Sequence, residues 1–367
     1  MDKRLAKRRG DKTNVPYLFL VRNMFSKIIG DIILDVPKVP GYGCGTRGIV
    51  MKSVLSDKHF HNEAAAYAFV EARVWPNGPV CPHCGGVERI GLLGGKSTRI
   101  GAYKCYQCRK PFTVKVGTVF EASHVPMRHW LQAMFLMSSS KKGISSNQLH
   151  RTLGCTLKTA WFISHRIREA MRVTGFEPMG GVGKVVESDE TYIGKFDANP
   201  ADYKPRGYGH KNAILTLVER GGAARSFHID GKSISDIMPI VLANVKRETR
   251  INTDEGGHYN DVSKDFGHDT VNHSKDEYVR YTTVVSFPDA KPYIVTTNTV
   301  EGYFSIFKRG MKGIYQHCSE KHLHRYLSEF DFRYSNRIAL GVNDIERTDR
   351  ALKGIVGKRL KYRTAYH

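Results

Sequence analysis

Two Cys-x-x-Cys pairs constrain the fold of this chain of 367 residues more than any other feature. The first pair is Cys81 and Cys84, and the second is Cys105 and Cys108, after twenty intervening residues. Each pair can present two thiolates from one tight turn, and two such turns complete a tetrahedral Zn²⁺ site. A redox motif would not occur twice at this spacing, and disulfides are disfavoured in an intracellular chain. The spacing therefore predicts a zinc ribbon whose Zn²⁺ is structural, because four thiolates close the site.

Cysteine content and hydropathy exclude two classes of protein. Seven cysteines are too few for a secreted disulfide scaffold of this length. Charges interrupt the longest apolar runs well short of the ~20 residues that a membrane-spanning helix needs. We therefore expect a cytoplasmic protein without a membrane-spanning helix.

The charge balance points to a polyanionic partner. The chain has 57 Lys and Arg against 35 Asp and Glu, a formal net charge of +22. Such a surplus favours nucleic acid or an anionic membrane surface, and a basic surface without a specific partner is the alternative. Much of the surplus falls in residues 141–172, with seven basic residues against one acid, and in residues 301–367, with fourteen against seven. These two segments lie beside the features that we expect to meet DNA, so we expect no membrane partner.

Composition divides the chain into five segments. Residues 1–50 are either a non-native extension upstream of a start at Met51 or a disordered basic arm that touches nucleic acid, and we favour the extension. A helix and the zinc ribbon fill residues 51–120, a helical region fills 121–175, and a mixed α/β domain fills 184–337 after a Gly/Pro linker. Residues 338–367 read as a basic C-terminal tail.

The helical region has the layout of a helix-turn-helix. A short helix with Ser145 as a plausible cap is followed by Gly154, which suits the turn, and then by a longer basic helix. Lys158, Arg166 and Arg168 on that helix are the predicted DNA contacts. An ordinary helical hairpin with a solvated basic face is the alternative.

The segment after the linker reads as α/β with a mixed sheet. Three strands in succession, a helix, a short strand and further helices give that class. The predicted strands and helices span residues 185–193, 213–219, 224–229, 233–246, 250–253, 298–311 and 322–332.

Three acids in this domain match what a magnesium site needs. Asp189 lies in the middle of an apolar strand, where an unpartnered charge is costly. Alternation puts it on the same face as Glu187 and opposite to Glu190. Asp254 follows the strand at 250–253, and Glu301 opens the helix at 298–311. Two Mg²⁺ ions held by such carboxylates can support phosphoryl transfer.

Each acid also has a purely structural explanation. Asp189 could pair with a core Lys or Arg, and Asp254 could be a turn residue before two glycines. Asn298 and Glu301 could form a capping box. A single metal site accounts for all three acids, and also for Lys308, which lies two helical turns beyond Glu301 on the same face.

A set of short motifs from about Met51 to Asn336 is specific in combination, although no single one of them is. These are Trp75-Pro-Asn-Gly78, Cys81-Pro-His-Cys-Gly85, Tyr103-Lys-Cys-Tyr-Gln-Cys108, Ser188-Asp-Glu-Thr-Tyr-Ile-Gly194, Thr253-Asp254, Val271-Asn-His-Ser274, Thr297-Asn-Thr-Val-Glu301, Phe307-Lys-Arg-Gly310, His322-Leu-His-Arg-Tyr-Leu327 and Phe332-Arg-Tyr-Ser-Asn-Arg337. With these motifs, the sequence resembles bacterial insertion-sequence transposases with an N-terminal zinc ribbon and an RNase H-like DDE domain (ISXO2-like transposases). The chain departs from the family at Thr296, where relatives often have His, and at Phe304, where they often have Trp.

The resemblance implies roles for individual residues. Asp189, Asp254 and Glu301 become the Mg²⁺-binding (or Mn²⁺-binding) catalytic triad, with two ions, and Lys308 and its neighbour Arg309 become DNA contacts. The zinc ligands become Cys81, Cys84, Cys105 and Cys108.

The implied activity is cleavage at the terminal inverted repeats of an insertion sequence, followed by strand transfer into target DNA. A homo-oligomer is expected, because two DNA ends must be joined, and a nucleoid-associated location follows from the DNA partner. A DNA-binding regulator built on the zinc ribbon and helix-turn-helix is one alternative, and an inactive, domesticated transposase derivative is another. A structure-specific nuclease or resolvase of the same fold is a third reading.

Overall fold

The structure is a computed structural model that describes residues 53–360 apart from 176, 196–210, 230–233 and 287–288. Residues 1–50, which the sequence predicts to be a non-native extension or a basic arm, lie outside the described residues. So do the end of the C-terminal segment, from residue 361, and the Ser233 position of the helix expected from 233 onward.

The zinc ribbon is a small antiparallel sheet after one helix. Its strands pair in the order β1-β2-β3, and aromatic rings of Trp75, Tyr103 and Phe112 pack beside the cysteines. The elements are α2 (Glu63–Val74), β1 (Ile90–Leu92), β2 (Tyr103–Cys105) and β3 (Pro111–Phe112).

The helical region has its own hydrophobic core, which contains the fully buried Trp130 and Leu149. Ser145 caps the first helix of the predicted helix-turn-helix, and Gly154 ends it with a left-handed φ of 64°. Its helices are α3 (Met127–Ser139), α4 (Ser146–Leu153) and α5 (Leu157–Met171).

The expected basic tail contains a fourth helix of this region, α9 (Asp344–Lys353), so the tail prediction is wrong for that part. Ala351 and Leu352 are fully buried in the core of the helical region, and α9 packs against α3. A capping box between Asn343 and Glu346 starts the helix. Most residues of this helix are charged or polar, so composition alone does not reveal that its apolar residues Ala351 and Leu352 lie on one buried face.

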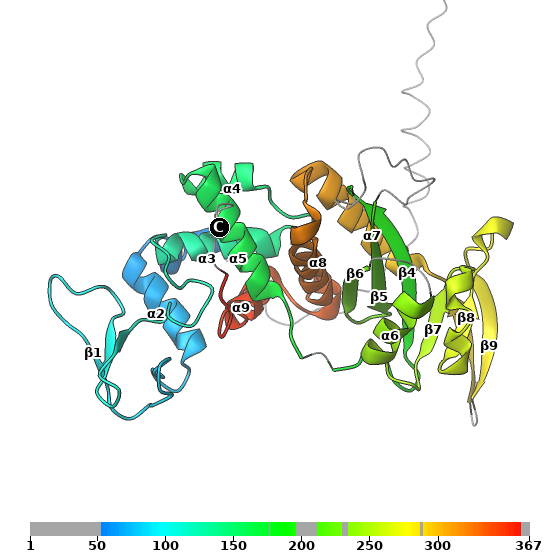
Figure 1. Cartoon of the computed structure of the whole chain (residues 1–367), viewed down its shortest axis with the longest axis horizontal. Helices are drawn as coiled ribbons and strands as arrows, with labels where there is room; N and C mark the ends of the chain where they lie inside the picture. Colours follow the sequence, from blue (N-terminus) through cyan, green and yellow to red (C-terminus); the bar gives the residue numbers. More distant parts are fainter. Residues whose placement is uncertain (1–52, 176, 196–210, 230–233, 287–288, 361–367) are drawn as a thin grey trace, which may run out of the picture. The chain divides into compact units, whose positions relative to one another are not determined.

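The domain after the linker is built on a mixed five-stranded sheet in the order β6-β5-β4-β7-β8 (Figure 1). The first three strands pair antiparallel, whereas β7 runs parallel to both β4 and β8. This arrangement is consistent with an RNase H-like fold, as expected from the sequence. The strands are β4 (Val185–Ile193), β5 (Asn212–Glu219), β6 (Ala224–Ile229), β7 (Arg250–Thr253) and β8 (Gly267–Thr270).

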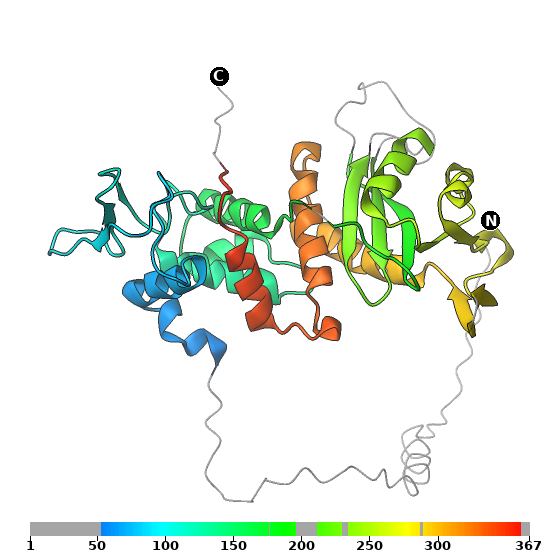
Figure 2. The ribbon, with the colours of Figure 1, turned by 90° about the horizontal axis from the view of Figure 1, so that it is seen from below.

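Helices cover both faces of this sheet, and strand β5 shows why. Its Ile214 and Val218 pack against α7 and α8, whereas Leu215 and Leu217 on the opposite face pack in the cluster that includes α6. In Figure 2, α8 is the orange helix beside β6, and it contacts α5 as well. The remaining elements are α6 (Ile234–Asn244), the hairpin β9 (Arg280–Ser286) and β10 (Asp289–Val295), α7 (Asn298–Gly310), a π-helical turn at Met311–Tyr315, and α8 (Glu320–Ser335).

No helix in the described part of the chain combines the length and the apolar character that crossing a membrane requires.

Candidate active site and zinc site

The four cysteines of the ribbon come together as the spacing predicts. All four Sγ atoms lie within 4.8 Å of one another, with 3.6 Å between Cys81 and Cys108 and 3.7 Å between Cys84 and Cys105. Four thiolates at about 2.3 Å from one tetrahedral Zn²⁺ stand about 3.8 Å apart, so the donor set fits that ion. The site has no open position, and its role is structural.

Asp189 lies in the middle of β4, and its pKa is raised to about 8. Burial is the largest cause, followed by the negative charges of Glu190, Asp254 and, more weakly, Glu301. A core Lys or Arg partner would lower this pKa, so the structure argues against the ion-pair explanation. The carboxylate instead accepts a hydrogen bond of 2.7 Å from the amide of Glu190.

Asp254 follows β7, which lies beside β4 in the sheet. Its Oδ1 accepts a hydrogen bond of 3.0 Å from the amide of Gly256, so it does shape the turn, as the structural explanation proposes. Its negative charge is also among the causes that raise the pKa of Asp189.

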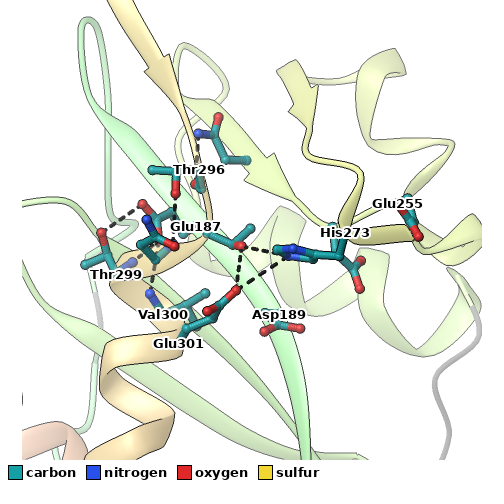
Figure 3. A network of polar contacts seen from close by, with 12 residues as sticks. Glu187, Asp189, Glu255, His273, Thr296, Thr299, Val300 and Glu301 are labelled. Atoms are coloured by element: carbon teal, nitrogen blue, oxygen red, sulfur yellow. Dashed lines mark hydrogen bonds and ion pairs between the residues drawn. The ribbon is translucent and has the colours of Figure 1, made fainter. Parts of the chain in front are cut away.

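Glu301 lies in the first turn of α7, and its side chain is 45% exposed. The helix begins at Asn298 without a side-chain cap bond, so the capping box between Asn298 and Glu301 is not formed. Glu301 instead accepts a hydrogen bond of 3.1 Å from Thr297 Oγ1 and faces His273 Nε2 at 3.5 Å (Figure 3).

The three acids interact electrostatically without forming a tight cluster. Among the residues that the structure describes, only the four cysteines bring three or more potential metal ligands within 4.8 Å of one another. Carboxylates repel each other in a site of low dielectric, and a cation is what would draw them together. The three acids therefore remain the predicted triad.

Sequence reasoning assigned no role to two polar residues beside these acids. His273 comes from the loop after β8 and points toward Glu301, with Asp189 close by in the same view (Figure 3). Glu187 is fully buried on β4 and accepts hydrogen bonds from the first turn of α7. The period-two alternation of β4 already put Glu187 on the face of Asp189, which is the signal that could have identified it.

The predicted DNA-binding residues divide into exposed and buried groups. Lys158, at the start of α5, and Lys308 and Arg309, near the end of α7, are exposed. Arg166 is only 4% exposed and Arg168 only 1%, so the expectation that they contact DNA is wrong for this structure.

The buried arginines have partners inside the protein. Arg166 donates to the backbone carbonyl oxygens of Val119 and Glu121 at 2.6 and 2.7 Å. Arg168 forms an ion pair of 2.6 Å with Glu329 of α8. Neither guanidinium group is available to a phosphate.

Comparison with known proteins agrees with this architecture. Residues 180–335 match the family described as the ISXO2-like transposase domain, and residues 61–111 match the transposase zinc-ribbon domain. The chain is 25% identical over 291 residues to an uncharacterized protein in transposable element ISH50 of Halobacterium salinarum. That alignment covers 75% of this chain and 92% of the relative.

One solved structure matches more distantly. It is a chain from the cryo-EM structure of the simian T-cell lymphotropic virus intasome in complex with PP2A regulatory subunit B56 gamma, with 14% identity and a TM-score of 0.24. The match covers 50% of this chain and 63% of that chain. The two domain matches carry the identification: the chain contains a transposase zinc-ribbon domain at residues 61–111, followed by an ISXO2-like transposase domain at residues 180–335.

Proposed function

We propose that this transposase cleaves DNA at the ends of an insertion sequence and joins those ends to target DNA, with Asp189, Asp254 and Glu301 as its catalytic acids. The observation that carries the proposal is the placement of Asp189 on β4 beside Asp254, which follows the neighbouring strand β7, and beside Glu301 in the first turn of α7 (Figure 3). The charges of both other acids raise the pKa of Asp189. Carboxyl groups with perturbed pKa values are typical of functional sites, and Asp254 follows the carboxyl end of a parallel strand, where ligands bind in α/β sheets. The family match over residues 180–335 contains all three acids.

Divalent cations fit this donor set. Two Mg²⁺ ions supply, when bound, activation of the attacking oxygen and stabilisation of the leaving oxygen. The chain itself contributes three carboxylates, which are held on β4, directly after β7 and on α7. Because each acid lies on a separate element, their spacing depends on how those elements are fixed to one another.

Double-stranded DNA is the proposed partner. Lys308 and Arg309 lie two turns along α7 from Glu301 and are exposed, so they can contact phosphates next to the acids. Lys158 in the first turn of α5 is the remaining exposed candidate of the helix-turn-helix-like region, whose N-terminal residues reach DNA in such motifs. Joining two ends calls for more than one copy of the chain in the working complex, and we propose a homo-oligomer.

A DNA-binding regulator is the competing function. It accounts for the zinc ribbon and the helical region, but it gives no reason for the unfavourable grouping of acids around Asp189. An inactive derivative would keep the fold and lose the chemistry.

The deciding experiment incubates the full chain and Mg²⁺ with a supercoiled plasmid that carries candidate terminal repeats. A transposase yields joined products, a nuclease yields only cut ones, and a regulator or an inactive derivative yields neither. Asp189→Ala is expected to abolish cleavage and to leave DNA binding nearly intact. Cleavage at the wild-type rate by this variant would refute the catalytic assignment.

Removal of zinc tests the role of the ribbon separately. We expect chelation to weaken binding to the element ends, because the four cysteines need Zn²⁺ to hold the ribbon together. Binding by fluorescence anisotropy, measured before and after chelation, checks this. End binding that persists would mean that the ribbon has another role.

A further inference from the structure

Strand β4 carries two glutamates that flank the proposed catalytic Asp189, and each is bonded to a different neighbouring element. We propose that Glu187 and Glu190 are positioning residues, which fix Glu301 and Asp254 respectively at the correct distance from Asp189. This inference rests on the proposed function of the same site.

Glu187 holds the start of α7. Its Oε2 accepts hydrogen bonds from the amides of Thr299 and Val300 at 2.7 and 3.0 Å. Its Oε1 accepts from Thr299 Oγ1 at 2.8 Å (Figure 3). The carboxylate thus takes the place of the side-chain cap that the helix lacks, and its negative charge suits a helix N-terminus. Glu301 is the next residue after these donors.

Arg220 links the same carboxylate to the segment that leads into α7. Its Nε donates to Glu187 Oε1 at 2.6 Å, and its terminal nitrogens donate to the carbonyl oxygens of Ile294 and Thr296 at 2.6 and 2.9 Å. The ion pair also offsets the cost of burying Glu187, which is 0% exposed. The segment before Glu301 is therefore anchored to β4 on both sides of the helix start.

On the opposite face of β4, Glu190 holds the segment that follows Asp254. Its carboxylate accepts a hydrogen bond from the hydroxyl of the buried Tyr259, and its Oε2 lies 3.1 Å from His258 Nε2. Both partners belong to the segment that follows Asp254, whose own Oδ1 is bonded to the amide of Gly256. Glu190 therefore fixes the far end of the turn that Asp254 begins.

The hydrogen bonds of Glu187 indicate that it positions Glu301 and does not itself bind a cation. Each of its two oxygens already accepts two hydrogen bonds from protein donors, so the carboxylate is saturated and does not offer a ligand atom to a cation. Its effect on the reaction must pass through Glu301. Glu190 likewise uses both oxygens for partners in the segment that follows Asp254.

The test measures cation binding and cleavage by Glu187→Gln and Glu190→Gln in the full chain. Gln replaces one accepting oxygen with a donor, so it breaks part of each anchor at nearly constant volume. We expect Mn²⁺ affinity, titrated by electron paramagnetic resonance without DNA, to fall at least fivefold. The Mg²⁺ concentration for half-maximal cleavage should rise by a similar factor, and added Mg²⁺ should restore much of the rate.

Two milder variants keep the test decisive if a buried Gln prevents folding. Thr299→Val removes one donor to Glu187, and Tyr259→Phe removes one donor to Glu190, while each carboxylate keeps its other partners. We expect each to weaken Mn²⁺ binding about twofold. Glu255→Gln is the matched control, because this exposed acid beside Asp254 bonds Ser274 instead, and its Mn²⁺ affinity should equal that of the wild type.

The outcomes separate the inference from the function on which it rests. If all four positioning variants lose thermal stability but bind Mn²⁺ like the wild type, Glu187 and Glu190 are merely structural and the inference is wrong, while the function stands. If Mn²⁺ binding to the wild type does not depend on Asp189, as Asp189→Asn would reveal, the metal site itself is wrong and the inference falls with it.

Discussion

Helices α5 and α7 both carry basic side chains that the sequence assigns to DNA, and the structure uses them in different ways. On α5, the second half of the helix is buried, and Arg166 and Arg168 are bonded within the protein. On α7, Lys308 and Arg309 are exposed near its end. Arg166 and Arg168 of α5 therefore hold the fold together, whereas Lys308 and Arg309 of α7 are presented to solvent next to the candidate active site.

The difference follows from what packs against each helix. Helix α8 lies against α5 and brings Glu329, which is fully buried between Arg168 and Arg333. Burial alone would raise the pKa of Glu329, and the positive charges of Arg333 and Arg168 lower it overall. The lesson is that a count of basic residues measures attraction to DNA only after the buried ones have been subtracted.

The largest expected effect comes from breaking the buried pair of α5. Arg168→Ala removes one partner of Glu329 and should lower the free energy of unfolding by about 3 kcal/mol, because it leaves a buried charge under-compensated. Urea denaturation followed by circular dichroism measures this. Unchanged stability together with a loss of DNA affinity would mean that Arg168 contacts DNA after all.

An effect of intermediate size is expected on the pH dependence of stability. It comes from Asp189 of β4, which has no basic partner within the described residues, unlike the ion-paired Arg168 of α5. The pKa of Asp189 is raised to about 8, so the metal-free folded protein holds a proton that the unfolded chain releases near pH 4. Proton binding by Asp189 therefore favours the folded state. This stabilisation is fully present below about pH 4 and is lost as the pH rises through 8.

We therefore expect metal-free wild type to lose on the order of 2 kcal/mol more stability between pH 5 and pH 8 than Asp189→Asn does. Thermal or urea unfolding in the presence of a chelator checks the difference. Parallel pH profiles for the two proteins would contradict the raised pKa.

The smallest expected effect is that of an exposed cation on α7. Lys308→Ala should weaken DNA binding by about 1 kcal/mol, almost regardless of sequence, and should reduce the slope of affinity against salt by about 1. Its free energy of unfolding should change by less than about 0.5 kcal/mol, because the residue is exposed. Fluorescence anisotropy at several salt concentrations provides the slope, and an unchanged slope would remove Lys308 from the DNA surface.

What the sequence could predict depended on the distance between partners along the chain. The zinc site was predictable because each cysteine pair lies within one turn, and the alternation of β4 correctly grouped Glu187 with Asp189. The burial of Arg168 could not be predicted, because its partner Glu329 is 161 residues away along the chain. Helix α9 was overlooked although the capping box at Asn343 was visible, since basic side chains hid its apolar stripe.

In the proposed mechanism, acids from separate elements act as one metal-dependent site. The most direct test compares Asp254→Asn with Glu255→Gln, since these neighbouring acids differ in whether they act on Asp189 or bond Ser274. We predict that Mg²⁺-dependent cleavage of an element end falls on the order of 10²–10³-fold in Asp254→Asn. In Glu255→Gln it should stay near the wild-type rate, and equal rates in the two variants would contradict the account.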